Sequence, residues 1–271
     1  MGAIGSSCEI DSVRPTDAIV RRVLYLPQTR TNEFMAKWET ADIKGTKFYM
    51  LAPVEEKGIS VSVLKVEPQE LKSEKIFVFS HGNGNDIYSS YPFMVNFAKR
   101  FGAVIICFDY PSYGRTQGIP NEINNVECLG TVVKHVAETY AADKIILMAH
   151  SLGTGVTFSY AAKVKWTSII ISISGYSSIP EVIIRKTSAR GLLGNHQYPS
   201  ITYIETLSCP IKLIHGEADE VINISHSYDL FAKCRNRILE SSWLKRIGHN
   251  DILDFLTQEG NEIHIAQALK L

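Results

Sequence analysis

The chain has 271 residues, of which 45% are apolar and 21% charged, and its 28 Lys and Arg balance 28 Asp and Glu. This composition is typical of a soluble globular protein and argues against wholesale disorder, a collagen, a small disulfide-rich protein and a basic nucleic-acid-binding protein. No apolar run approaches the roughly 20 residues that a membrane-spanning helix needs.

The first 40 residues are predicted to form an N-terminal segment that precedes the folded domain. Gly2 follows the initiator Met, and Ser6 stands where the N-myristoylation pattern requires Ser or Thr. Cys8 lies within reach of a second acylation, which matters because one myristoyl chain alone gives only marginal membrane binding. Residues 17–27 are mixed basic and apolar, which suits a short amphipathic helix at a membrane surface or packed on the domain. The alternative is a chance match of a loose pattern.

Short apolar segments rich in β-branched residues recur along residues 41–271 and predict strands, most of them covered on both faces. They are Lys47–Leu51, Ile59–Val66, Lys75–Ser80, Ala103–Asp109, Lys144–Ala149, Ser168–Ile173, Ile211–His215 and Ser242–Ile247. The first two are expected to pair as a hairpin through the turn at Glu55–Gly58.

Helix-like stretches separate the later strands, at 90–101, 122–140, 152–164, 224–236 and 260–270. Within 122–140, apolar residues from Val126 to Tyr140 fall on one helical face. Alternating strands and helices predict one α/β domain with a mostly parallel eight-stranded sheet and helices on both faces. A small cap is expected over 175–210, where apolar residues either cover an acyl chain or pack on the sheet.

A nucleophile elbow is predicted between the strand at 144–149 and the next helix. Ala149-His150-Ser151-Leu152-Gly153 has the small residue, Ser and Gly spacing of this turn, with Ala149 in place of the first Gly. The elbow would expose the Ser151 hydroxyl and direct the Leu152 N–H and the helix N-terminus at developing negative charge.

Two further strand ends supply the partners that a serine nucleophile requires. Asp219 follows the strand at 211–215, with Glu217 and Glu220 as competing carboxylates, and His249 follows the strand at 242–247. The order Ser, Asp, His is that of enzymes with this elbow, and all three positions lie at the sheet edge where open α/β folds place their sites. The sequence therefore predicts a Ser151–His249–Asp219 triad.

The turn after the strand at 75–80 is predicted to complete an oxyanion hole. His81-Gly82-Asn83-Gly84 places the Asn83 N–H beside Leu152 as a second donor. An alternative for Gly82-Asn83-Gly84 is a dinucleotide-binding loop with Asp109 at the next strand end, but Ile87 then occupies the third glycine position.

Five cysteines, Cys8, Cys107, Cys128, Cys209 and Cys234, are scattered without zinc spacing. Their odd number indicates reduced thiols in a cytosolic compartment.

At this point a family resemblance is evident. The motifs His81-Gly82-Asn83, Phe108–Gly114, His150–Gly153, Ile214–Ile222 and Gly248–Asp251 resemble the α/β-hydrolase domain-containing protein 17 family over roughly residues 59–256. The resemblance implies a membrane-anchored serine hydrolase that removes palmitate from cytosolic protein cysteines, with Ser151 as nucleophile, Asp219 as acid and His249 as base. Three features differ from the family. Ala149 begins the elbow in place of Gly, and Gly84 and Asn85 replace the family's usual pair before the acidic residue, here Asp86. At the N-terminus, Cys8 beside Gly2 replaces the family's cysteine cluster.

The expected activity is cleavage of acyl thioesters or esters, with an acylated protein or lipid ester as substrate, at the cytosolic face of a membrane. This chemistry requires no cofactor and no metal. The alternatives are a carboxylesterase or monoacylglycerol lipase, less readily an aminopeptidase, or a catalytically idle hydrolase fold that binds a partner. Neutral net charge gives no reason to expect nucleic acid, and the oligomeric state is left open.

Overall fold

The computed structural model describes residues 15–53, 58–184, 193–234 and 239–270. Gly2 and Cys8, the predicted lipidation sites, therefore lie outside the described residues. The predicted division of the chain at residue 40 stays a prediction.

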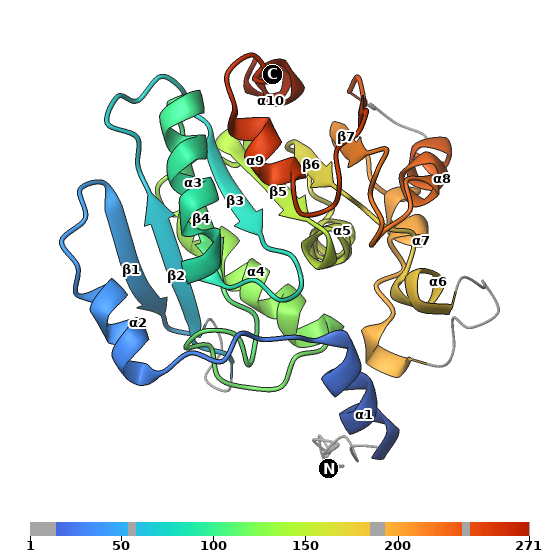
Figure 1. The fold of residues 1–271 in the computed structure, drawn as a ribbon, viewed down its shortest axis with the longest axis horizontal. Coiled ribbons are helices and arrows are strands. Elements are labelled where there is room, and N and C mark those ends of the chain that lie inside the picture. The colour runs from blue at the N-terminus through green and yellow to red at the C-terminus, as the bar shows by residue number, and fades with distance from the viewer. Residues whose placement is uncertain (1–14, 54–57, 185–192, 235–238, 271) are drawn as a thin grey trace, which may run out of the picture.

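The described residues form an eight-stranded sheet in the order β1-β2-β4-β3-β5-β6-β7-β8 (Figure 1). The strands are β1 (Thr46–Leu51), β2 (Val61–Val66), β3 (Ile76–Ser80), β4 (Val104–Phe108), β5 (Ile145–His150), β6 (Ile170–Ile173), β7 (Ile211–Gly216) and β8 (Ser242–Leu244). β2 is antiparallel to both β1 and β4, whereas the remaining pairs, β4 with β3, β3 with β5, and so on to β8, are parallel. The predicted antiparallel pairing of the first two strands and the mostly parallel sheet are confirmed, while most of the predicted turn at Glu55–Gly58 lies outside the described residues.

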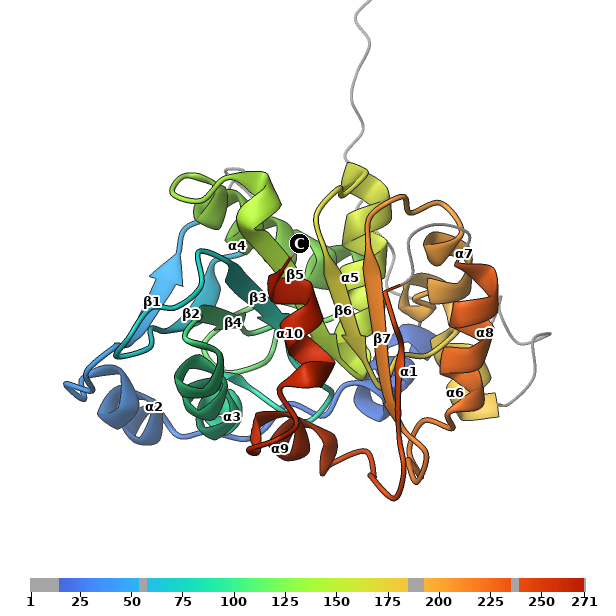
Figure 2. The ribbon, with the colours of Figure 1, turned by 90° about the horizontal axis from the view of Figure 1, so that it is seen from above.

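Helices cover both faces of the sheet, as Figure 2 shows from above. They are α1 (Pro15–Leu24), α2 (Asn32–Glu39), α3 (Ile87–Phe101), α4 (Glu122–Ala137), α5 (Leu152–Val164), α6 (Ile179–Ile184), α7 (Ser200–Ile204), α8 (Ser225–Lys233), α9 (Ile252–Thr257) and α10 (Ile263–Leu269). No helix in the described ranges is both long and apolar enough to span a bilayer.

Two hydrophobic cores result because successive side chains of a strand point to opposite faces. In β3, Ile76 and Val78 pack with α4 and α5, while Phe77 and Phe79 pack with α3, α9 and α10. All four side chains are at most 1% exposed. The apolar face predicted for α4 is confirmed, since the apolar side chains between Val126 and Val136 are part of the first core.

Several helices and strands begin or end at residues other than those predicted. α3 begins at Ile87, before the predicted 90, because the Asp86 side chain caps it and exchanges hydrogen bonds with Ser89. β8 ends at Leu244, earlier than the predicted Ile247. The short helices α2, α6, α7 and α9 were not predicted, because five to eight residues carry little periodicity.

The cap region over 175–210 contains α6 and α7, and most of its described apolar residues pack on the sheet. Tyr176 and Tyr198 are buried in the first core, and Ile179, Val182 and Ile201 are partly buried against it. Ile183, in contrast, is 51% exposed. Packing against the core therefore explains most of the apolar residues that the sequence placed in a cap.

Gly155 in α5 tests the packing between this region and the sheet. A Cβ there would lie 2.1 Å from the Tyr176 hydroxyl and 2.7 Å from Tyr198 Cβ. We expect Gly155→Ala to lower the free energy of unfolding by about 1–3 kcal/mol, because the two buried tyrosines cannot move apart cheaply.

Gly130→Ala in α4 is the matched control. Its Cβ would meet the Tyr160 ring at 3.4 Å, an ordinary contact, so helix propensity predicts an unchanged stability or a gain of up to ~1 kcal/mol. Chemical denaturation of both variants measures the difference. Equal effects would contradict the packing argument.

Candidate active site

The turn between β5 and α5 holds Ser151 in a strained conformation at the carboxyl end of the sheet. Ser151 has φ 52° and ψ −122°, a positive φ that a residue with a Cβ seldom adopts. Its N–H donates to the Ile173 carbonyl of β6 at 3.0 Å. A Cβ on Gly153 would lie 2.1 Å from the Ser80 carbonyl oxygen, so glycine is required two residues after the serine. The turn thus has the geometry expected of the predicted nucleophile elbow, with Ala149 fully buried in β5.

One chain of hydrogen bonds joins the three predicted triad residues. His249 Nε2 lies 3.0 Å from Ser151 Oγ, and His249 Nδ1 lies 2.7 Å from Asp219 Oδ2. Ser151, Asp219 and His249 are 6%, 7% and 8% exposed, so these three hydrogen-bonded residues are largely shielded from water but still reach the surface. This arrangement allows the imidazole to accept the serine proton while the carboxylate orients the ring.

Asp219 is held as a carboxylate by several donors. Its Oδ1 accepts the Val221 and Ile222 N–H groups at 2.9 and 2.7 Å, and its Oδ2 faces both His249 and His215. Burial alone would raise the pKa of Asp219, but the hydrogen bonds from His215, His249 and the Ile222 N–H hold that pKa well below its ordinary value. Asp219 therefore stays ionised beside His249.

The competing carboxylates Glu217 and Glu220 are both exposed, and Asp219 is the one that contacts His249. The distinction follows from the tight turn after β7, which directs Asp219 inward while its neighbours point to solvent.

His215 supports Asp219, a role that the sequence did not reveal. Its Nε2 lies 2.9 Å from the Ile222 carbonyl and 3.3 Å from Asp219 Oδ2, and its Nδ1 lies 2.6 Å from the Ser227 hydroxyl. A carbonyl only accepts, so Nε2 carries the proton and Nδ1 accepts from Ser227. The sequence signal was weak, since a histidine at the end of β7 is more commonly a packing residue.

The two predicted oxyanion donors lie on either side of Ser151. Leu152 begins α5, where the first N–H groups have no intrahelical acceptor. On the other side, a Cβ on Gly82 would lie 3.3 Å from Ser151 Cβ, so the loop carrying Asn83 passes directly beside the serine. Within the described ranges, neither the Asn83 nor the Leu152 N–H donates to a protein acceptor. Both remain available to a substrate oxygen.

Asp109 does not occupy the position that a dinucleotide-binding loop requires. Its side chain is fully buried, where Oδ2 accepts from Ser62 Oγ at 2.6 Å and Oδ1 accepts from the Ile87 N–H at 2.9 Å. Burial raises the pKa of Asp109, although contact with His81 opposes the shift. Asp109 therefore ties strand β2 to the N-terminus of α3 and is not available to a ribose. Among the described residues, no group of three His, Cys, Asp or Glu side chains is placed to hold a metal ion.

A cavity of about 610 Å³ adjoins the triad at Asp219. Its walls come from α6, α8 and the turn after β7, and they are mostly polar. They include Glu181, Glu220, Asn223, His226 and Asp229, with Val182 and Val221 as apolar contributions. This cavity is suited to a polar portion of a substrate rather than to an acyl chain.

Comparison with known proteins identifies the family. A family model described as the α/β hydrolase fold matches residues 75–173. A protein of Acanthamoeba polyphaga mimivirus, named as a candidate α/β hydrolase, is 35% identical over 204 residues, which are 74% of this chain and 76% of the viral protein. The chain belongs to the α/β-hydrolase family.

The predicted resemblance within that family is confirmed. The human α/β-hydrolase domain-containing protein 17C is 29% identical over 182 residues, or 66% of this chain. The match covers 54% of the human protein and 56% of its mouse counterpart, so it spans just over half the length of these relatives.

Solved structures agree on the fold. An esterase of Pyrococcus furiosus superimposes with a TM-score of 0.67 over 91% of this chain and 97% of its own, at 14% identity. A serine hydrolase homologue of Coxiella burnetii gives a TM-score of 0.61 over 84% and 99%, at 16% identity. Together with the sequence relatives, this α/β-hydrolase architecture supports hydrolase activity.

His150, which directly precedes Ser151 in this α/β hydrolase, is expected to make stability depend on pH. Burial, reinforced by the neighbouring His249, lowers the pKa of His150 from 6.5 to about 3. The unfolded chain therefore binds this proton more readily, and the stability that neutral His150 contributes is lost as the pH falls below 6.5.

We expect the free energy of unfolding to fall by roughly 2 kcal/mol more in the wild type than in His150→Phe between pH 6.5 and about 4.5. This range lies above the ordinary pKa of Asp219, 3.8, so loss of its carboxylate starts at lower pH. Urea denaturation at the two pH values measures the difference. Parallel pH dependence of the two proteins would show that His150 takes up no proton on unfolding.

Proposed function

We propose that this α/β hydrolase is a serine hydrolase that cleaves acyl thioesters and removes palmitate from S-acylated proteins at the cytosolic face of a membrane. The observation that carries the proposal is the hydrogen-bonded chain from Ser151 through His249 to Asp219, at 3.0 and 2.7 Å.

In the proposed mechanism, His249 Nε2 accepts the Ser151 proton as Oγ attacks the acyl carbonyl carbon. Asp219 receives the Nδ1–H hydrogen bond and stabilises the imidazolium that forms. The carbonyl oxygen becomes an oxyanion between the Asn83 and Leu152 N–H groups. The tetrahedral intermediate then collapses as its carbon–sulfur bond breaks, and the departing thiolate takes the proton from the His249 imidazolium. Neutral His249 next accepts a proton from the water that attacks the acyl-enzyme, and returns it to Ser151 Oγ as the fatty acid leaves.

The preference for a thioester rests on chemistry and on the relatives. A thiolate is a stable leaving group, so its departure demands less proton transfer than that of an alkoxide. The resemblance to the α/β-hydrolase domain-containing protein 17 family, which implies removal of palmitate from protein cysteines, favours this substrate class over others that the fold accommodates. The polar cavity beside Asp219 could receive the peptide that carries the acylated cysteine.

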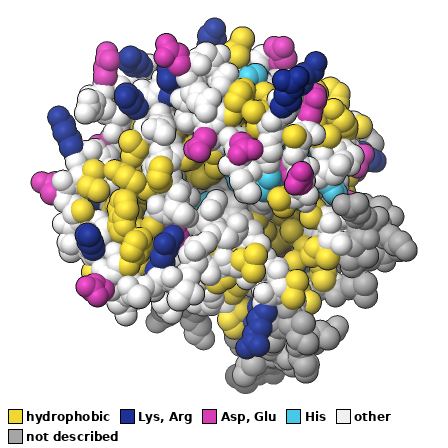
Figure 3. All heavy atoms as spheres, viewed as in Figure 1, with side chains coloured by type: hydrophobic (Ala, Val, Ile, Leu, Met, Phe, Trp, Pro, Cys, Tyr) yellow, Lys and Arg dark blue, Asp and Glu magenta, His cyan; other side chains and the backbone are white. Residues whose placement is uncertain are grey.

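The surface around α1 supports a membrane-adjacent location. Arg21 and Arg22 occupy its last turn, and Val23 and Leu26 are 66% and 55% exposed. Figure 3 shows apolar and basic side chains together over this helix, at the lower edge of the molecule. Such a combination attracts an anionic lipid surface and buries apolar side chains in it.

Ser151→Ala tests the nucleophile. We expect this variant to lose labelling by a fluorophosphonate probe and to lose palmitoyl-thioester hydrolysis by about 10⁴-fold or more, because no other residue takes over the attack. Ser159→Ala, on the outer face of the same helix with its hydroxyl on Glu122, is the matched control and should label like the wild type.

A higher kcat/KM for palmitoyl thioester than for palmitoyl oxoester would support depalmitoylation, whereas the reverse order would favour the carboxylesterase or lipase alternative. A folded wild type that does not label at all would indicate a binding module and contradict the proposed activity.

The lipid anchor is tested by mass and by sedimentation. Co-expression with an N-myristoyltransferase is expected to add one myristoyl group to the wild type and none to Gly2→Ala. When the protein is expressed in eukaryotic cells, Cys8→Ser should bind less to vesicles that contain anionic lipid than the wild type does. The reason is that one acyl chain anchors a protein weakly and two anchor it stably. An unchanged intact mass of the wild type would rule out the myristoyl anchor.

A further inference from the structure

The segment between α1 and α2 crosses the loop that carries Asn83. We call residues 24–30 the N-terminal strap and residues 81–86 the oxyanion loop. In Figure 1 the strap is part of the blue trace that runs from α2 to α1 along the lower edge of the molecule. It is irregular after Leu24, and the family motifs discussed above do not include it.

The strap engages the Asn83 side chain from two backbone groups. Asn83 Nδ2 donates to the Leu24 carbonyl at 2.7 Å, and Oδ1 accepts the Leu26 N–H at 3.0 Å. Oδ1 also accepts the Tyr113 hydroxyl at 2.8 Å. The amide is therefore bonded at both ends, which fixes the direction of the side chain and of the backbone that carries it.

Two further strap side chains hold the rest of the oxyanion loop. Gln28 Nε2 donates to the Gly84 carbonyl at 2.6 Å. Arg30 donates from Nε and Nη2 to the two oxygens of Asp86 at 2.8 and 3.3 Å. Burial by itself would raise the pKa of Asp86, but the bonds from Arg30 and Ser89 hold that pKa below its ordinary value. Asp86 is thus a buried carboxylate that depends on Arg30.

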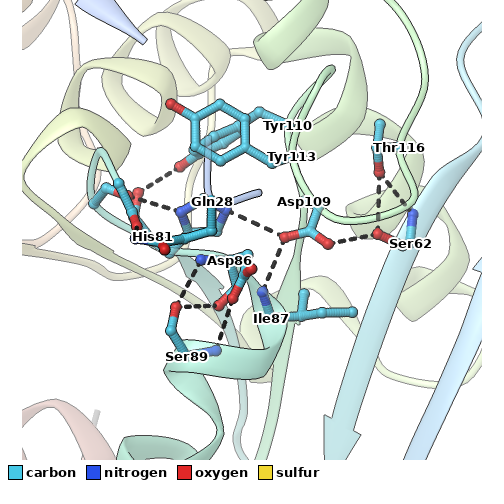
Figure 4. A network of polar contacts seen from close by, with 12 residues as sticks. Gln28, Ser62, His81, Asp86, Ile87, Ser89, Asp109, Tyr110, Tyr113 and Thr116 are labelled. Atoms are coloured by element: carbon cyan, nitrogen blue, oxygen red, sulfur yellow. Dashed lines mark hydrogen bonds and ion pairs between the residues drawn. The ribbon is translucent and has the colours of Figure 1, made fainter. Parts of the chain in front are cut away.

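The opposite side of the loop is fixed to the sheet, as Figure 4 shows. Tyr110 donates to the His81 carbonyl at 2.8 Å, and the Ile87 N–H donates to Asp109. Gly82 lies against His150 and Ser151. The oxyanion loop is consequently a single layer between the strap and the nucleophile.

This loop needs outside support because of its composition. Gly82 and Gly84 flank Asn83, and Gly84 has φ 78°, in the region that glycine enters freely. A donor in an oxyanion hole must lie within about 2.7–3.1 Å of the developing oxyanion, so small rotations of this backbone weaken it.

We propose that the N-terminal strap positions the Asn83 N–H for transition-state stabilisation, with Gln28 and Arg30 as positioning residues. The inference rests on the proposed function, because it takes Asn83 as an oxyanion donor. It assigns a role in the chemical step to a segment that directly follows the proposed membrane-binding helix.

The test compares Arg30→Ala, Arg30→Lys and Gln28→Ala with the wild type in palmitoyl-thioester hydrolysis. Rates are divided by the number of active sites, which is counted by fluorophosphonate labelling carried to completion. We expect kcat to fall about 10- to 100-fold in Arg30→Ala, less than for outright loss of one oxyanion donor. KM should change little, and Arg30→Lys should recover part of kcat because it keeps the charge but not the paired geometry.

An inhibitor that forms a tetrahedral adduct with the enzyme distinguishes a misplaced oxyanion donor from a general loss of protein stability. Affinity for an alkyl trifluoromethyl ketone should weaken by the same factor as kcat/KM, while affinity for palmitate, a ground-state ligand, should not. Arg100→Ala is the matched control, since Arg100 is also paired at α3, with Glu262 at 2.8 Å, and should keep wild-type kcat.

The inference is overturned if Arg30→Ala and Gln28→Ala both keep the wild-type kcat per labelled site. In that case any loss of total activity only reflects a smaller number of folded active sites. Gln28→Ala removes one exposed hydrogen bond and so keeps the test decisive if Arg30→Ala fails to fold. Absence of labelling and hydrolysis in the wild type would overturn the proposed function itself, and that result is distinguishable because the wild type is assayed first.

Discussion

The close approach of the turn after β5 to the end of β3 is the constraint on which the site depends. Gly153 lies so near the Ser80 carbonyl that no side chain fits between them, and Ser151 in the same turn has a positive φ. The strain is tolerated because the surrounding strands are buried and because the Ser151 N–H is bonded to β6. The same contact brings the loops after β3 and β5 together, so that the proposed nucleophile and the proposed oxyanion donors lie close to one another.

Around this turn the site is assembled from strand ends that are distant in sequence. β7 and β8 contribute Asp219 and His249 through short loops, and the parallel register aligns their carboxyl ends with that of β5. Each residue is then oriented by neighbours, as His215 and the Ile222 N–H do for Asp219. The oxyanion loop follows the same rule, with the Asp109 network on one side and the strap on the other.

The fold and the hydrogen-bonded arrangement of Ser151, His249 and Asp219 were predictable because they leave local signals. Apolar runs marked the strands, a small-residue turn marked the elbow, and Asp219 and His249 stood directly after strands in the expected order. The strap left no such signal. Its contacts join residues 56 to 59 positions apart, as Arg30 does with Asp86 and Leu24 with Asn83, and an irregular segment has no periodicity. The apolar cap residues were ambiguous for a related reason, since packing on the sheet and covering a ligand require the same side chains.

The most direct test of the account is to trap the covalent intermediate. Wild-type protein mixed with excess palmitoyl thioester, quenched in acid within the first turnover and digested, is analysed by peptide mass spectrometry. We expect the palmitoyl group that is trapped to be attached at Ser151, at up to one group per active site, and to be absent from Ser151→Ala. Acylation at another residue, or palmitoyl-thioester hydrolysis at the wild-type rate in Ser151→Ala, would contradict the central claim that Ser151 is the nucleophile.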